Sequence, residues 1–179
     1  MASELRVDRI VPTTGVPTGG GGGVIQVVQS VVTSSSTGTG NTPASVMTCS
    51  ITPKEITNKI LVMIDTNVGS GNGYNTVAYL YRGTGGSGTK IYFGDADGDR
   101  PRVSKTANIY DGTSQNYMQI PLQIHYLDSP SSTSQITYDL RLASYQSISW
   151  SFNRSVANQN TSEYDGVNAS SMTLMEVSA

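Results

Sequence analysis

Charged residues are scarce in this sequence. Only 13% of its 179 residues are charged, about half of the usual share, and the formal net charge is −2. The eleven lysines and arginines are scattered, so the chain lacks the basic surface that nucleic-acid binding requires. Disordered chains combine low hydrophobicity with high net charge, and the net charge here is small. The composition therefore predicts a folded protein with no nucleic-acid partner.

Cysteine and histidine occur once each. The lone Cys49 excludes an intrachain disulfide framework and is expected to be a buried thiol. Together with His125 it cannot supply the ligands of a tetrahedral zinc site. The sequence around His125 also has no nucleophile elbow and no Cys–His signature. No catalytic residue is assigned, and we expect a protein that is not an enzyme.

Long apolar stretches are also missing. The first ten residues include Glu4, Arg6, Asp8 and Arg9, which exclude the apolar centre of a signal peptide. Apolar runs such as 60–64 are far shorter than a membrane span. We therefore expect no insertion into a membrane.

The first 23 residues differ from the rest and predict an extended N-terminal arm. Pro12 and Pro17 exclude a continuous helix, and the five glycines at 19–23 are typical of a flexible tether. The aliphatic residues before them suit a segment that docks as an extended strand on another surface, and a disordered terminus is the alternative. The side chains expected to attach the arm are Leu5, Val7, Ile10 and Val11.

From Val24 onward the hydrophobic period is mostly two, which is typical of β-strands. Strands are predicted at 24–32, 46–52, 59–65, 74–82, 89–94, 116–127, 135–144, 148–152 and 171–177. A Ser/Thr/Gly loop is predicted at 33–42. Pro121 cannot donate to a β-ladder, so its strand is expected at a sheet edge or with a bulge.

The strand predicted at 59–65 is apolar on both faces, because Leu61 and Met63 point away from its other apolar side chains. Such a strand needs cover on both sides, from a sandwich interior or from a subunit contact. Eight or nine short strands with frequent turns predict an all-β fold. The expected architecture is a jelly-roll-like antiparallel β-sandwich over residues 24–179, preceded by the arm.

One group of acidic residues has the composition of a cation site. Asp95, Asp97 and Asp99 alternate around a glycine, and three carboxylates can wrap a hard cation such as Ca²⁺. Their spacing does not match the helix–loop–helix calcium motif. The alternative is an Asp/Gly turn whose charge is neutralised by Arg100 and Arg102. Ca²⁺ is the one cofactor that the sequence offers.

Tyrosines are abundant, ten against two phenylalanines. A tyrosine combines an apolar ring with a polar tip, which suits contact with sugars and proteins. Most of the ten are expected to be half-buried strand residues. The candidates for receptor contact lie beside flexible polar loops and are Tyr74, Tyr110 and Tyr164.

The order of several segments resembles a known family. These segments are ELRVDRIVPTTG, the glycine tether into VIQVVQ, SITP followed by NKILVMID, YLDSPSSTSQITYDLRL and the closing SSMTLMEVSA. Over nearly the whole chain they resemble small tail-fibre or virion structural proteins of tailed phages, especially phages of aquatic bacteria. The last strand is similar in kind to that of trimeric jelly rolls of the tumour-necrosis-factor and complement-head type. Residues 83–115 depart most from the family pattern.

The resemblance implies a virion structural protein that assembles in the host cytoplasm. Its expected form is a homotrimeric short tail or neck fibre, with the arm on other virion proteins and the head on a host glycan or protein. Closed symmetry would also cover leftover apolar faces without an open sheet edge. The alternative is a capsid decoration protein, either a head fibre or a cement protein.

Two hypotheses from other functional classes fit the sequence less well. The first is a lectin-like module outside virions. A signal peptide would support it, and the first ten residues do not contain one. An enzyme that cleaves polysaccharide needs two carboxylates fixed across a cleft, whereas the acidic residues here lie mainly in turns and at strand ends.

Overall fold

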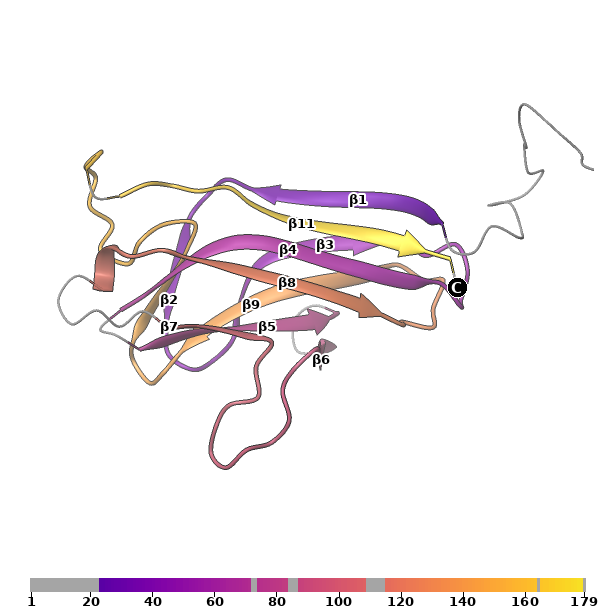
Figure 1. Ribbon diagram of the computed structural model, residues 1–179, viewed down its shortest axis with the longest axis horizontal. Coiled ribbons are helices and arrows are strands. Elements are labelled where there is room, and N and C mark those ends of the chain that lie inside the picture. The colour runs from indigo at the N-terminus through magenta and orange to yellow at the C-terminus, as the bar shows by residue number, and fades with distance from the viewer. Residues whose placement is uncertain (1–22, 72–73, 84–86, 109–114, 164, 179) are drawn as a thin grey trace, which may run out of the picture.

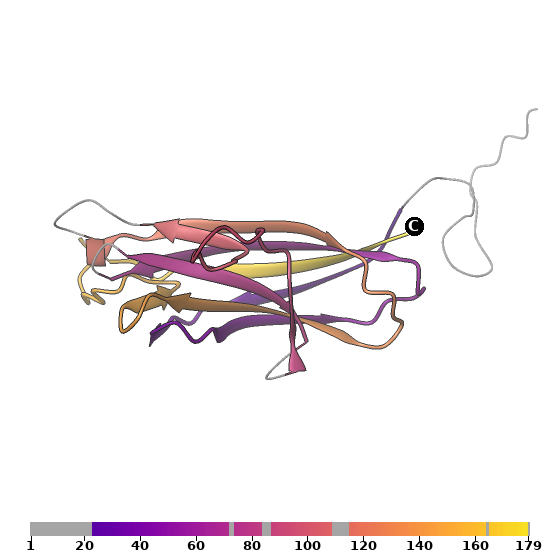
Figure 2. The same ribbon diagram turned by 90° about the horizontal axis from the view of Figure 1, so that it is seen from below.

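The computed structural model describes residues 23–71, 74–83, 87–108, 115–163 and 165–178. These residues form two antiparallel sheets stacked face to face (Figures 1 and 2), together with the short 3-10 helix η2 (Gln115–Tyr117). The prediction of an all-β sandwich is confirmed. Among the described residues, no helix combines the length and hydropathy needed to cross a membrane. The predicted attachment side chains Leu5, Val7, Ile10 and Val11 lie outside the described residues.

Sheet A is built around the long strand β4. Its strands are β1 (Val24–Val32), β2 (Ser36–Thr39), β4 (Lys59–Ser70), β8 (Ile120–Asp128), β10 (Ser149–Phe152) and β11 (Ser170–Val177). β4 pairs with β8, with β11 along its first half and with β10 near its end. β1 pairs with β11, and β2 pairs with β10. Among the described residues β8 pairs with β4 alone, so Pro121 occupies an edge strand, as predicted.

Sheet B has β9 and β5 at its centre. Its strands are β3 (Ala44–Ile51), β5 (Asn75–Arg82), β6 (Thr89–Ile91), β7 (Lys105–Asn108) and β9 (Ile136–Ser144). The order is β3-β9-β5, and β6 and β7 pair with different parts of β5. The order β1-β11-β4-β8 in one sheet and β3-β9-β5-β7 in the other fits the jelly-roll interpretation, which stays an interpretation of the winding order.

The core between the sheets follows the period-two pattern. Leu122 and Ile124 on β8 are buried, while Gln123 and His125 between them are exposed. On β9 the four side chains predicted to face inward are all buried: Ile136, Tyr138, Leu140 and Leu142. Cys49 is a free, buried thiol, as predicted, and burial raises its pKa. The sandwich interior therefore comes directly from the alternation in the sequence.

The predicted loop at 33–42 is wrong in its middle, where Ser36–Thr39 form β2 and pair with β10. The sequence STGT has no alternation of apolar and polar residues that would predict a strand. The pairing requires a glycine at position 38, because Gly38 lies against the indole of Trp150, so close that a Cβ on Gly38 would sit 2.3 Å from Trp150 Cζ2.

The strand predicted at 89–94 is also shorter in the structure. β6 ends at Ile91, because Tyr92 takes a positive φ of 50° that a strand does not accommodate. Further along, Lys105–Asn108 form β7, a short strand that the sequence pattern did not predict.

The outer face of sheet A carries a row of apolar side chains across four strands. Register pairs Val27 with Met175, Met175 with Leu61, and Leu61 with Leu127. Val27 and Leu127 are 54% and 47% exposed, and the other two are half-buried. We call these four residues the apolar row. Within the described residues, β4 is covered fully on its inner face only, and not on both faces.

The two ends of the sandwich carry different segments. Gly23 N donates to Ser178 Oγ (2.9 Å), and Ser178 N donates to Gly23 O (3.0 Å), so these residues meet at one end. β4 starts at the same end, where Lys59 pairs with Val177. Its 12 residues then extend roughly 36 Å. β5 begins at the opposite end, just after Tyr74.

Candidate functional site

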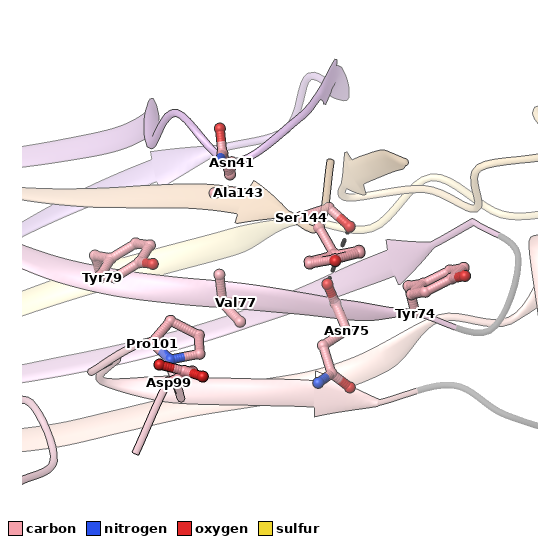
Figure 3. A pocket seen from close by; sticks show the side chains of 10 residues that line it. Asn41, Tyr74, Asn75, Val77, Tyr79, Asp99, Pro101, Ala143 and Ser144 are labelled. Atoms are coloured by element: carbon pink, nitrogen blue, oxygen red, sulfur yellow. Dashed lines mark hydrogen bonds between the residues drawn. The ribbon is translucent and has the colours of Figure 1, made fainter. Parts of the chain in front are cut away.

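A groove lies on the outer face of sheet B, toward the end of the sandwich opposite Gly23 (Figure 3). Its volume of ≈ 480 Å³ lies within the range of small-molecule sites, roughly 300–1,000 Å³. Strands β5 and β9 and the loops beside them supply the lining: Asn41, Tyr74, Asn75, Val77, Tyr79, Asp99, Pro101, Ala143, Ser144 and Tyr145.

The floor of the groove is apolar. Val77, Tyr79 and Ala143 face outward, because their neighbours along β5 and β9 face the core. They form a second buried cluster, against which Tyr81 and Val103 pack. Burial, and to a smaller extent the neighbouring Tyr81, raises the pKa of Tyr79, so its phenol stays neutral. The floor therefore offers apolar surface without a charge.

One wall is the loop 92–104, which connects β6 with β7. Ser104 N donates to Ala78 O (2.9 Å), and Leu80 N donates to Ser104 Oγ (2.9 Å), which fixes the end of the loop on β5. At the start of the loop, Lys90 Nζ and the Arg102 guanidinium lie 5.0 Å and 4.5 Å from the centre of the Phe93 ring. These contacts hold the loop against the sheet and bring Asp99 and Pro101 to the groove (Figure 3).

The end of the groove is formed by two stacked tyrosines. The rings of Tyr74 and Tyr145 are 5.8 Å apart and inclined by 16°. They are 46% and 56% exposed, so both keep accessible surface. Ser144 Oγ donates to Asn75 O (3.0 Å; Figure 3), and Gln146 Nε2 donates to the Tyr145 hydroxyl (3.1 Å). The pair is thus placed by the ends of β5 and β9.

The rim is polar and carries charge of one sign. The side chains of Asn41, Asn75 and Asp99 are exposed, and the structure shows no hydrogen bond from them to other described residues. The described lining contains one carboxylate and no lysine or arginine. Lys90, which lies over the Tyr79 ring, is instead bound to Arg102 O at 2.9 Å. The rim therefore offers two amides and one carboxylate, and no cation belongs to the described lining.

Of the three tyrosines predicted to contact a receptor, the structure places Tyr74 in this groove. Tyr110 and Tyr164 lie outside the described residues. Tyr145 was missed because it directly follows a predicted strand. Its neighbours, Ser144 and Gln146, are polar, like the residues beside Tyr74. The same criterion would therefore have predicted Tyr145 as a contact residue.

The three aspartates predicted to bind Ca²⁺ are exposed in loop 92–104. Asp97 accepts from Arg100 Nη1 at 2.8 Å, as the turn interpretation expects. Asp99 lines the groove, and Asp95 does not. In the described part of the chain, no three His, Cys, Asp or Glu side chains gather closely enough to hold a metal ion. The geometry therefore gives the Ca²⁺ prediction no support.

The turn interpretation expected Arg102 to pair with the aspartates, and the structure shows other contacts for it. Its Nε donates to Gly94 O at 2.8 Å, and its guanidinium lies over the Phe93 ring. The arginine thus shapes the loop instead of balancing its charge.

The buried carboxylates lie away from the groove and are held by neighbouring side chains. Asp128 accepts from the Tyr138 hydroxyl (2.7 Å) and pairs with Arg82 (3.1 Å). Asp139 faces outward, as predicted, yet its side chain is buried. Its carboxylate accepts hydrogen bonds from Ser45 Oγ (2.6 Å) and Arg141 Nε (2.7 Å). These contacts give both carboxylates a structural role.

No protein-family model matches the chain, and no curated protein is similar to it. Among solved structures, it is similar to VP2 of infectious bursal disease virus in a subviral particle (10% identity, TM-score 0.39, 93% of this chain and 44% of that chain). It is similar to a T=1 particle derived from the same virus (11%, TM-score 0.39, 93% and 42%). The chain spans less than half the length of these proteins.

Proposed function

We propose that this chain is a structural protein of a phage virion, a short tail or neck fibre whose head binds the host surface. The observation that supports it is the separation of the two ends of the head. The chain enters at Gly23, and the aromatic groove lies toward the other end of a strand roughly 36 Å long. An arm attached to a particle at the first end would leave the groove facing outward. The sequence resemblance to tail-fibre proteins supports the same assignment.

The proposal includes a homotrimer assembled through the apolar row. The row and the groove lie on the outer faces of different sheets, so covering one leaves the other open. Complete burial of a fully exposed valine or leucine contributes about 1.5–3 kcal/mol, and Val27 and Leu127 would gain about half of that, since they are 54% and 47% exposed. Closed threefold symmetry covers such a face without leaving a further sheet edge for aggregation.

Several copies of one head would also raise the apparent affinity for a surface. Linked sites bind the second and third ligand at a high effective concentration, so each groove can bind weakly on its own. A fibre needs no catalytic residues to bind a surface. Its binding free energy grows with the number of grooves that are occupied at the same time.

The proposal is tested by deleting residues 1–18 and following incorporation into particles. We expect the truncated head to fold, because the described core begins after them, and to be lost from purified particles. Circular dichroism checks the fold, and quantitative mass spectrometry of the particles measures copy number. Truncated copies present at the level of the full chain would show that attachment does not use the arm.

A matched pair of full-length variants sharpens this test. Leu5→Asp, Val7→Asp and Ile10→Asp together should abolish incorporation. Thr13→Asp and Thr14→Asp together should leave it unchanged. A copy number in the hundreds for the unmodified chain would overturn the fibre assignment and favour capsid decoration.

A further inference from the structure

We propose that the groove on sheet B binds neutral saccharides, with the Tyr74–Tyr145 pair as its apolar platform and Asn41, Asn75 and Asp99 as its hydrogen-bonding rim. The inference names the chemistry of the host-surface ligand and in that sense rests on the proposed function. Its test uses purified protein, so the two can fail independently.

The apolar surface of the groove is complementary to the apolar face of a sugar ring. A pyranose presents C–H groups on its faces and hydroxyls around its edge. The exposed rings of Tyr74 and Tyr145, with Val77 on the floor, supply apolar surface for such a face. A mostly apolar pocket with a few placed polar groups is the usual form of a small-molecule site.

The rim supplies partners for the hydroxyls at the edge of the ring. The amides of Asn41 and Asn75 each donate and accept, and the Asp99 carboxylate accepts only. Sugar hydroxyls do both, so they can satisfy all three side chains. A hydrogen bond to the Asp99 carboxylate would be charge-assisted and therefore the strongest of the set.

Charge decides which saccharides fit. The described lining holds one carboxylate and no cation, so a uronate, sialate or phosphate group would meet the charge of Asp99 with no lining cation to pair with it. A neutral hexose or N-acetylhexosamine carries no such charge. The groove should therefore select neutral residues within a host glycan.

The sheet beneath the groove argues against a peptide as occupant. β9 pairs with β3 and β5, and β5 pairs with β9, β6 and β7, so the backbone groups under the groove are used within the sheet. An extended peptide gains much of its affinity by adding to a free strand edge, which these central strands do not offer. Recognition by side chains alone suits a saccharide.

The test is saturation-transfer NMR and titration of the full chain with the methyl glycosides of glucose, galactose, mannose, N-acetylglucosamine and glucuronic acid. We expect at least one neutral glycoside to bind with a Kd on the order of 1 mM, because ligands of this size rarely bind tightly. Tyr145→Ala should weaken that binding about tenfold. Tyr117→Ala, at an exposed tyrosine outside the groove, is the matched control and should leave it unchanged.

A second pair of variants tests selectivity, which a merely structural role would not change. Asp99→Asn should reduce the preference for neutral glycosides over the glucuronide, by about threefold to tenfold. Asp95→Asn, in the same loop but outside the lining, should keep the preference of the unmodified chain.

Three outcomes would overturn the inference. These are no binding to any glycoside, equal effects of Tyr145→Ala and Tyr117→Ala, and binding of an unrelated extended peptide in place of the sugars. Glycoside binding by a protein absent from particles would remove the proposed function and leave the inference standing. Particle incorporation without glycoside binding would overturn the inference and leave the proposed function standing.

Discussion

At the scale of single residues, Glu176 shows how this neutral sandwich accommodates a buried charge. The residue is fully buried on β11. Its carboxylate accepts from Asn58 Nδ2 (2.6 Å), Gln26 Nε2 (2.5 Å) and Lys54 N (2.7 Å). Burial alone would raise its pKa, but these hydrogen bonds outweigh burial and hold the pKa below its usual value. Glu176 thereby ties β1, β11 and the segment before β4 together.

Replacing Glu176 with glutamine should destabilise the fold by about 2–4 kcal/mol, because an amide nitrogen would face groups that already donate. Since the folded pKa is lowered, the contribution of Glu176 is complete above its unfolded pKa of about 4.3 and is lost as pH falls through the folded value. Urea unfolding between pH 3 and 7 at one protein concentration measures both effects. The unmodified chain should lose stability below about pH 4, and Glu176→Gln should lose less.

Glu163→Gln is the matched control, since Glu163 is exposed. It should change stability by less than about 0.5 kcal/mol. An equal cost for both substitutions would show that the hydrogen bonds around Glu176 do not stabilise the fold.

At the scale of the elements, the pairing of β2 with β10 depends on one close packing contact. Trp150 on β10 is buried, with 3% exposure, and its indole crosses the backbone at Gly38. A side chain at position 38 would occupy the place of the indole ring. The strand therefore needs a glycine that leaves room for the indole of a residue far away in the sequence, and its own residue types do not indicate this.

Gly38→Ala should destabilise the protein by about 1–3 kcal/mol, because a buried indole has no free space into which it can move. Thermal or urea unfolding gives the magnitude, and near-ultraviolet circular dichroism of the single tryptophan reports the displaced ring. Gly94→Ala is the control, since a Cβ there meets nothing within 4 Å. Equal stability of the two variants would contradict the packing argument.

At the scale of the whole molecule, the apolar row on sheet A predicts an assembly. Light scattering should return about three times the 19.0 kDa of one chain. Leu127→Lys places a charge in the row at a position already 47% exposed, so it should release monomers while the head stays folded. Gln123→Lys, on the same strand and face, is the control and should remain trimeric. A monomer or dimer for the unmodified chain would remove the trimer from the proposal.

The sequence by itself determined the class of fold. Alternation on β8 and β9 set which side chains enter the core, because a side chain's face follows from its position along a strand. Pro121, which has no backbone N–H to donate, indicated an edge strand or a bulge, and the structure has the edge strand. Cys49 was predicted as a core thiol on the same grounds. These features are local, so the order of residues is sufficient to state them.

Only the tertiary structure decided the site. Tyr74 and Tyr145 are far apart in the sequence, and their rings meet because β5 and β9 pair in one register. Asp99 joins them through the path of loop 92–104 and not through the spacing of the aspartates. β2 likewise depends on the distant Trp150. Contacts of this kind are set by which strands become neighbours, and a hydrophobic pattern carries no record of strand order.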